Sequence, residues 1–245
     1  MCTNYTPSSR DRLRAARLGV AHLPEGDWPP EVYPGYEAPI LVRGGAPGQH
    51  DVAPRCLLAR FGLVPRWSRD AAHAKELSRH TTNARSETAA VKPSFRSPWR
   101  DRHWGLAPME NFFEPCWGTG RAVRWRIARA DGDLFAAAGL WERWADPASG
   151  EVTTSFTLLT VNADAHPLMA RMHRPGDEKR MPVLLAPGDF EAWLHATDEQ
   201  AHALVHKTYA VPICGEPAPR APPPVRVRRV TPPAPDAPDD TLNLF

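Results

Sequence analysis

The chain has 245 residues, of which 42% are apolar and 28 are proline, and its formal net charge is +2. The apolar fraction excludes a fully disordered chain, and the proline content disfavours coiled coils, helical bundles and helical repeats. No stretch reaches the roughly 18 apolar residues of a membrane span, and the amino terminus lacks the pattern of a secretory signal. We therefore expect a cytoplasmic protein.

The predicted elements are short and mixed in type. Residues 8–18 open with a serine cap and predict a helix, and residues 23–55 predict a loop with short extended pieces. Residues 56–64 predict a strand that ends at Pro65, and residues 71–79 predict a short helix. Residues 121–129 alternate apolar and basic side chains, as a half-buried strand does.

The second half of the chain continues this mixture. Two apolar runs, 134–143 and 155–162, predict central strands, and 187–195 and 197–206 predict helices. Strands scattered among short helices, without strict alternation, indicate an α+β fold. We expect one domain over residues 1–212 and a disordered, proline-rich tail over residues 213–245.

The basic and sulfur-containing residues limit the kind of site. Arginine outnumbers lysine by 26 to 4, which fits either a GC-rich genome or a preference for binding phosphates and carboxylates. The four cysteines stand far apart and form no metal-binding pair. We expect reduced thiols, no metal and no cofactor.

Cys2 is a candidate nucleophile because of its position. Removal of the initiator Met1 would leave a thiol and a free α-amine on one residue, and both groups titrate near neutral pH. Such an aminothiol condenses with an aldehyde to an imine and then closes a thiazolidine ring. Taken alone, a cysteine at position 2 is weak evidence, because most such residues are incidental.

A polar segment in the first half adds specificity. It reads Asn83-Ala-Arg-Ser-Glu-Thr88 and is followed by Lys92-Pro-Ser-Phe-Arg96. Together these strings resemble the signature of the SRAP family, the SOS response-associated peptidase domain. Further matches occur in the family's order at Met1-Cys2, Tyr36-Glu-Ala-Pro39, Phe61-Gly-Leu-Val-Pro-Arg-Trp67, Asn111-Phe-Phe-Glu114, Phe135-Ala-Ala-Ala-Gly-Leu-Trp-Glu142, Met172-His173 and Arg180-Met-Pro-Val183.

The resemblance implies a mostly antiparallel, barrel-like sheet and the capture of abasic sites in single-stranded DNA. Cys2 would seal the ring-opened sugar as a thiazolidine crosslink and so shield the lesion during the SOS response to DNA damage. Asn83 resembles the amide that orients the terminal amine. Glu114 resembles the carboxylate that assists ring opening, and its aromatic neighbours could raise its pKa. His173 resembles the acid and base at the sugar oxygen.

DNA contacts follow the general rules for single strands. Arg85 and Arg96 are the phosphate candidates, Trp67 is the stacking candidate, and Pro39 belongs to the family's early Ala-Pro element. For Trp67, packing in the core is an equally open alternative. We expect a monomer associated with the nucleoid.

Three departures from the family pattern affect the site. Asn4 stands where the family has an arginine that contacts phosphate, and Phe61 replaces a tryptophan. Between His173 and Arg180, six residues replace one, which leaves the position of His173 open. Two other functions remain open: a thiol peptidase or hydrolase with Cys2 as its N-terminal nucleophile, and a non-covalent module that binds modified bases or single strands. The crosslinking protein itself could also have lyase activity.

The end of the tail carries its own hypothesis. Thr241-Leu-Asn-Leu-Phe245 looks like the peptides with which bacterial DNA-maintenance proteins bind the replication sliding clamp, although their first glutamine is absent. Leu242, Leu244 and Phe245 would be the apolar contacts. An unstructured end with chance apolar residues is the alternative.

Overall fold

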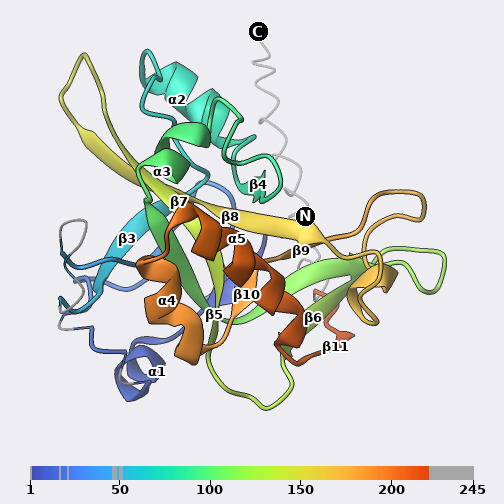
Figure 1. Ribbon diagram of the computed structural model, residues 1–245. Coiled ribbons are helices and arrows are strands. Elements are labelled where there is room, and N and C mark those ends of the chain that lie inside the picture. Colours follow the sequence, from blue (N-terminus) through green and yellow to red (C-terminus); the bar gives the residue numbers. More distant parts are fainter. Residues whose placement is uncertain (1, 17, 21, 46–48, 50–51, 221–245) are drawn as a thin grey trace, which may run out of the picture.

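One large sheet with short helices at its surface forms the protein (Figure 1). The computed structural model describes residues 2–16, 18–20, 22–45, 49 and 52–220. The strands are β1 (Tyr5–Pro7), β2 (Glu37–Val42), β3 (Arg55–Phe61), β4 (Asn83–Arg85), β5 (Trp104–Cys116), β6 (Val123–Arg129), β7 (Phe135–Ala145), β8 (Val152–Asn162), β9 (Arg180–Pro182), β10 (Leu184–Leu185) and β11 (Ile213–Pro217). The helices are α1 (Arg10–Ala15), α2 (Ala71–Ser78), α3 (Arg96–Arg100), α4 (Phe190–Leu194) and α5 (Asp198–Val205), with 3-10 turns η1 (Met169–Arg171), η2 (Pro187–Asp189) and η3 (His206–Ala210).

Five of the strands close into a barrel. The hydrogen-bonded order β7-β8-β3-β2-β5 returns to β7, because β5 also pairs with β7. Of these five pairings only β3 with β8 is parallel. The predicted α+β fold with a mostly antiparallel, barrel-like sheet is confirmed.

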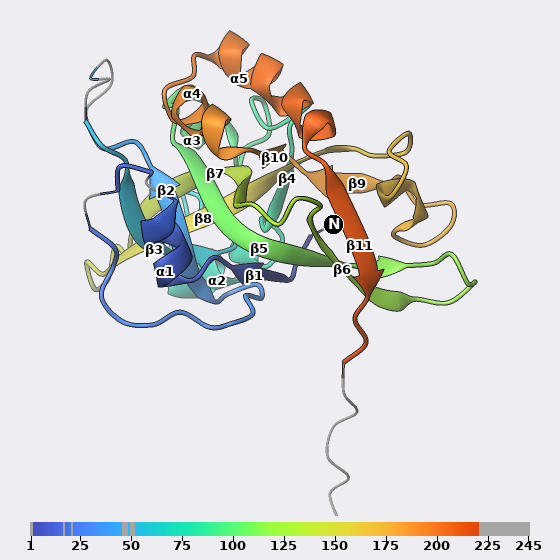
Figure 2. The ribbon, with the colours of Figure 1, turned by 90° about the horizontal axis from the view of Figure 1, so that it is seen from below.

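The long strand β5 connects the barrel to the amino terminus. Its first half pairs with β7, from Trp104 to Met109, and its second half pairs with β6, from Phe112 to Cys116. The short strand β1 also pairs with β5, with Tyr5 opposite Phe112. Figure 2 shows β5 running from the helical side of the molecule towards β6 and the amino terminus. This strand therefore brings Glu114 close to the beginning of the chain.

Side-chain caps fix where the longer helices begin. Ser9 accepts a hydrogen bond from the backbone N–H of Arg12, and Asp70 accepts one from His73. Thr197 and Gln200 form a reciprocal capping box at α5. The predicted helices at 8–18, 71–79 and 197–206 are thus confirmed, and the one at 187–195 is divided into η2 and α4.

The ordered chain extends past the predicted domain boundary at residue 212. Strand β11 pairs with β6 over five residues, with Ile213 opposite Arg129 and Pro217 opposite Trp125. The boundary at 212 is therefore wrong: β11 covers an edge of the sheet that would otherwise be unpaired. Leu242, Leu244 and Phe245 lie outside the described residues. Within the described residues, no helix is long and apolar enough to cross a membrane.

Candidate active site

Cys2 lies in the interior, three residues before β1. Its side chain is fully buried, and its thiol lies 3.9 Å from the carbonyl oxygen of Asn4. The Nδ2 atom of Asn83, at the start of β4, donates a hydrogen bond to the carbonyl oxygen of Cys2 at 2.8 Å. The structure thus brings together the two residues that the sequence places 81 positions apart.

Glu114 and His173 form the second half of this cluster. The Nδ1 atom of His173 lies 3.5 Å from Oε2 of Glu114. The backbone N–H of His173 donates to the carbonyl oxygen of Pro115, and Met172 bridges to Cys116. These contacts attach the histidine to the edge of β5 despite the longer segment that follows it. The position of His173, which the sequence left open, is therefore defined.

Burial controls how these groups ionise. The Glu114 side chain is only 2% exposed, and this burial raises its pKa to about 7. The direction of this pKa shift is the one expected from the sequence, and its cause is burial. Burial also lowers the pKa of His173, so the imidazole is neutral at pH 7. A neutral imidazole beside a half-ionised carboxyl can both accept and donate a proton.

The surroundings of the Cys2 thiol control its ionisation. Burial, followed by the negative charge of Glu114, raises its pKa far above the ordinary value. In the chain that carries Met1, a thiolate here would lose its hydration and face a carboxylate, so the thiol is neutral. The partly ionised thiol expected for a chain that begins at Cys2 stays a prediction. The sulfur needs a base to take its proton when it reacts.

Tyr5 is a site neighbour that the sequence did not single out. Its ring is fully buried, and among the described residues its hydroxyl has no hydrogen-bond partner. Burial raises the pKa of this hydroxyl, and the neighbouring Cys2 thiol adds to the shift only in its ionised form. A tyrosine in a short terminal strand is typical of core packing, so nothing in the sequence indicated that Tyr5 lies close to Cys2.

The DNA-binding candidates lie in different surroundings. Arg85 is about half exposed and forms an ion pair with Glu178, with 2.7 Å between Nη2 and Oε2. Trp67 is 45% exposed, and its Nε1 donates to the carbonyl oxygen of Pro93. Arg96 is exposed at the start of α3. Pro39 is instead buried within β2, where it pairs with Leu58, and does not present a surface for DNA.

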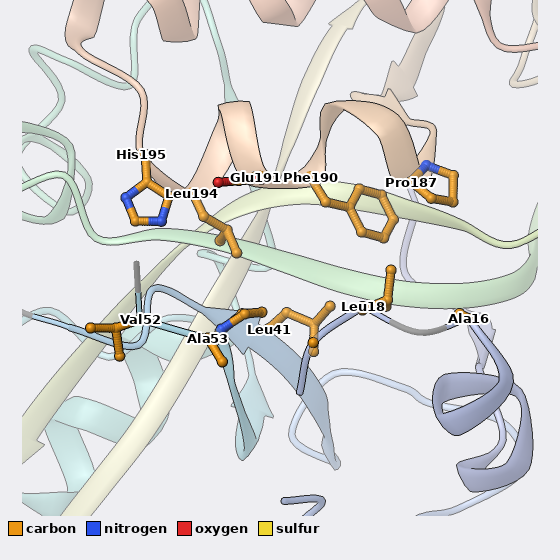
Figure 3. Close-up of a pocket in the computed structure, with 12 residues that line it drawn as sticks. Ala16, Leu18, Leu41, Val52, Ala53, Pro187, Phe190, Glu191, Leu194 and His195 are labelled. Carbon is orange, nitrogen blue, oxygen red and sulfur yellow. The ribbon is translucent and has the colours of Figure 1, made fainter. Parts of the chain in front are cut away.

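A cavity of about 660 Å³ lies elsewhere, between the end of α1, β2 and α4. Figure 3 shows Phe190 and Leu194 facing Leu41 across it, with His195 and Val52 at one end. Its lining includes none of Cys2, Asn83, Glu114 and His173. The polar cluster at Cys2, rather than this apolar cavity, carries the groups suited to catalysis. Within the described residues, no group of histidine, cysteine and carboxylate side chains could hold a metal ion.

Comparisons with known proteins place the chain in a family. A family model described as SOS response associated peptidase (SRAP) matches residues 1–214. The abasic site processing protein YoqW of Bacillus subtilis is 30% identical over 178 residues, which cover 71% of this chain and 70% of the relative. The abasic site processing protein HMCES of Pongo abelii is 26% identical over 234 residues, covering 78% of this chain and 63% of the relative.

Solved structures agree with this match. An X-ray structure of a protein from Bordetella bronchiseptica has a TM-score of 0.76 at 32% identity, covering 89% of this chain and 99% of the other. A second, from Bacteroides thetaiotaomicron, has a TM-score of 0.71 at 23% identity, covers 87% of this chain and 90% of the other, and supports the fold alone. The chain belongs to the SOS response associated peptidase family.

Proposed function

We propose that this protein binds single-stranded DNA and captures abasic sites covalently through Cys2. The observation that carries the proposal is the convergence of Cys2, Asn83, Glu114 and His173 in one polar cluster, in which Cys2 and Glu114 are buried and interact electrostatically. Relatives named abasic site processing proteins support the substrate class. An abasic sugar in its ring-opened form supplies the aldehyde with which a terminal aminothiol reacts.

The reaction balances as a condensation. After removal of Met1, the α-amine of Cys2 adds to the aldehyde carbon, and the resulting carbinolamine loses one water to give an imine. The sulfur then forms a bond to the imine carbon, and its proton passes to the nitrogen. One carbon–nitrogen and one carbon–sulfur bond form, one water leaves, and no oxidant is needed.

The surroundings of Cys2 supply the proton transfers. Glu114 has a pKa of about 7, so its carboxylate form can accept the thiol proton and its acid form can return it. The neutral His173 serves as acid and base at the sugar oxygen during ring opening. Among the described residues, the buried Oδ1 of Asn83 has no hydrogen-bond partner. This oxygen is therefore available to orient the α-amine.

The strand would be held outside this cluster. Arg85 and Arg96 bind phosphates, and the exposed ring of Trp67 stacks on a base. Binding of this kind weakens with salt because phosphate contacts release counterions.

A crosslinking assay tests the proposal. The purified protein, with loss of Met1 verified by intact mass, is mixed with an oligonucleotide that carries one abasic site and is run on a denaturing gel. We expect a heat-stable shifted band that Cys2→Ser, Cys2→Ala and one added N-terminal residue all abolish. The exposed Cys214 provides the matched control, because Cys214→Ser should crosslink fully. A stable band from Cys2→Ser would contradict the ring mechanism, and native-gel binding alone would indicate a non-covalent module.

A thiol peptidase with Cys2 as its nucleophile is the alternative enzyme. Because burial keeps the thiol neutral, such an enzyme would also need a base such as His173 to take the thiol proton. Cleavage of peptides at a rate that depends on Cys2, without a crosslink to abasic DNA, would support the peptidase instead.

The terminal peptide supports a second, separate interaction. We propose that Leu242, Leu244 and Phe245 bind the replication sliding clamp, on the basis of the sequence pattern alone. A peptide of the last 15 or so residues should bind the host's clamp, and Leu244→Ala with Phe245→Ala should abolish binding. No signal from the wild-type peptide at several hundred micromolar would contradict it.

A further inference from the structure

Arg85, a proposed phosphate ligand, is already paired with a carboxylate of its own chain. On β4, side chains two positions apart point to the same face, so Arg85 follows Asn83 along the face that contacts Cys2. Glu178 lies on the segment 174–179, which leads from His173 to β9. Its Oε2 atom lies 2.7 Å from Nη2 of Arg85.

Glu178 lies between Arg85 and Arg180 in a row of alternating charges that ends at Glu87. Its other oxygen, Oε1, accepts a hydrogen bond from Nη1 of Arg180 at 2.6 Å. Arg180 is buried, and its Nη2 also donates to both carboxylate oxygens of Glu87. The guanidinium of Arg180, and after it that of Arg85, lowers the pKa of Glu178. Glu178 is therefore ionised at neutral pH and neutralises Arg85.

The two cations in this row differ in what a ligand can reach. The Arg180 side chain is 4% exposed and is held by Thr160 as well as by Glu87, so it keeps a partner without Glu178. Arg85 is 54% exposed, and Glu178 is 34% exposed. A solvent-accessible ion pair of this kind contributes little to stability, so exchanging its carboxylate for another anion costs little free energy. A phosphate can therefore replace Glu178 at Arg85 while the buried part of the row stays intact.

Replacement of Glu178 leaves the contacts at the two ends of segment 174–179 in place. Nζ of Lys179 donates to the carbonyl oxygens of His173 and Arg174, and Nε2 of His173 lies 3.0 Å from the carbonyl oxygen of Arg180. These contacts close the segment independently of the Glu178 side chain. Loss of the contact between Glu178 and Arg85 therefore does not remove the contacts that hold the histidine of the cluster.

We propose that Glu178 is a built-in competitor for the DNA phosphate at Arg85 and sets how strongly the protein binds undamaged single strands. The proposal rests on the DNA binding described above. Because Glu178 is paired with Arg85, the protein binds undamaged DNA with lower affinity. Stable retention on DNA then depends on the covalent step at Cys2. Glu178 is in this sense a specificity-determining residue.

Binding of an undamaged single-stranded oligonucleotide tests the proposal, measured by fluorescence anisotropy at several salt concentrations. Glu178→Gln should bind about 3–10-fold more tightly at low salt, with a steeper salt dependence, approaching one more released counterion. Asp11→Asn provides the matched control, because it removes the same charge from an exposed arginine pair on α1. In an Arg85→Ala background, Glu178→Gln should change the affinity no more than Asp11→Asn does.

The outcomes separate this proposal from the proposed function. Equal affinities for Glu178→Gln and Asp11→Asn would overturn the competitor role, even if the wild-type protein crosslinks abasic DNA normally. An equal gain from Glu178→Gln with and without Arg85 would also overturn it, because the gain would then be a general charge effect. Failure to crosslink abasic DNA would contradict the covalent mechanism alone. Thermal unfolding of each variant verifies that the fold is intact.

Discussion

Glu114 shows how a single buried carboxyl links stability to pH. Its folded pKa of about 7 lies above the ordinary value of 4.5. The folded state therefore keeps a proton that the unfolded chain releases between these two values. We compare the free energy of unfolding of the wild type with that of a variant that does not titrate at this position. The difference favours the wild type most below pH 4.5, and it shrinks as the pH rises towards 7.

We expect Glu114→Gln to become progressively more stable than the wild type as the pH rises. The difference between the two free energies of unfolding should grow by about 2–3 kcal/mol from pH 5 to pH 8, since one pKa unit corresponds to about 1.4 kcal/mol. Urea unfolding at the two pH values measures it. A difference that stays constant would show that Glu114 is not shifted. A costly carboxyl that is kept in the interior is typical of a functional group.

The same substitution should damage crosslinking. Glu114→Gln cannot take the thiol proton, and general acid–base groups contribute roughly 10²–10⁴-fold in rate. We expect the wild-type rate to rise through pH 7 as the carboxylate forms, and this inflection to vanish in the variant. The inflection of the α-amine near pH 8 should remain in both. Single-turnover gels across pH 5–9 measure the profiles, and an unchanged inflection at pH 7 would contradict the assignment.

Asn83 has a different effect because it holds the backbone rather than a proton. Asn83→Ala removes the donor to the Cys2 carbonyl and the buried Oδ1 atom, which has no hydrogen-bond partner among the described residues and which we propose orients the α-amine. We expect slower crosslinking at saturating DNA with little change in affinity for the strand. Arg85→Ala should do the reverse and weaken binding with a shallower salt dependence. If Asn83→Ala lost affinity but kept the wild-type rate, its role in positioning would be wrong.

At the scale of the elements, the sequence predicted strands where the local pattern is clear and missed β5, where prolines interrupt it. Strands at 121–129, 134–143 and 155–162 showed alternation or continuous apolar runs and were found as β6, β7 and β8. Strand β5 was not predicted, because Pro108 and Pro115 interrupt its sequence. Its pairing with β1, β6 and β7 keeps it extended all the same. Tertiary pairing of this kind is invisible in a local pattern.

The candidate site had the same limitation. Motif matches identified its members, but only the closed sheet shows that Glu114 and His173 are neighbours. Glu178 could not be found from sequence because its partner, Arg85, stands in a distant segment. The surroundings of Cys2 likewise include residues much later in the chain, Asn83 at its carbonyl oxygen and the carboxylate of Glu114. Residue chemistry was therefore more predictable than residue environment.

Two hydrogen bonds to residues of β7 hold the turn that carries Trp67. Nε of Arg66 donates to the buried carboxylate of Glu142 at 2.8 Å, and Nε1 of Trp144 donates to the carbonyl oxygen of Ser68 at 2.9 Å. These contacts flank Trp67 on both sides and leave its ring 45% exposed. An exposed aromatic ring on a fixed turn is suited to stack on an unpaired base.

We expect Trp67→Ala to weaken binding of single-stranded DNA by about 1–3 kcal/mol, the usual contribution of one stacked base. Its melting temperature should stay near that of the wild type, because much of the ring is already in solvent. Trp144→Phe should instead lose about 1 kcal/mol of stability with its buried hydrogen bond. Anisotropy titrations and thermal unfolding separate the two effects. Unchanged affinity in Trp67→Ala would remove this ring from the DNA-binding surface.

At the scale of the whole molecule, the last described strand extends the folded unit beyond residue 212. Ile213 packs against the core, and Gly215 lies close to Trp125 and Leu168, where a Cβ would come within 3.2 Å of the indole. The N–H of Ala218 still donates to the carbonyl oxygen of Arg124. Composition alone drew the boundary earlier, because the proline-rich character begins while the chain is still paired with β6.

Two truncations test this boundary. A chain that ends at residue 220 keeps β11, and we expect it to unfold at the temperature of the full chain and to crosslink abasic DNA equally well. A chain that ends at residue 212 loses the strand pairing and the packing of Ile213, which should cost about 2–4 kcal/mol. It also exposes the edge of β6, so it should aggregate more readily. Differential scanning calorimetry and light scattering measure both effects, and equal stability of the two truncations would show that β11 is dispensable.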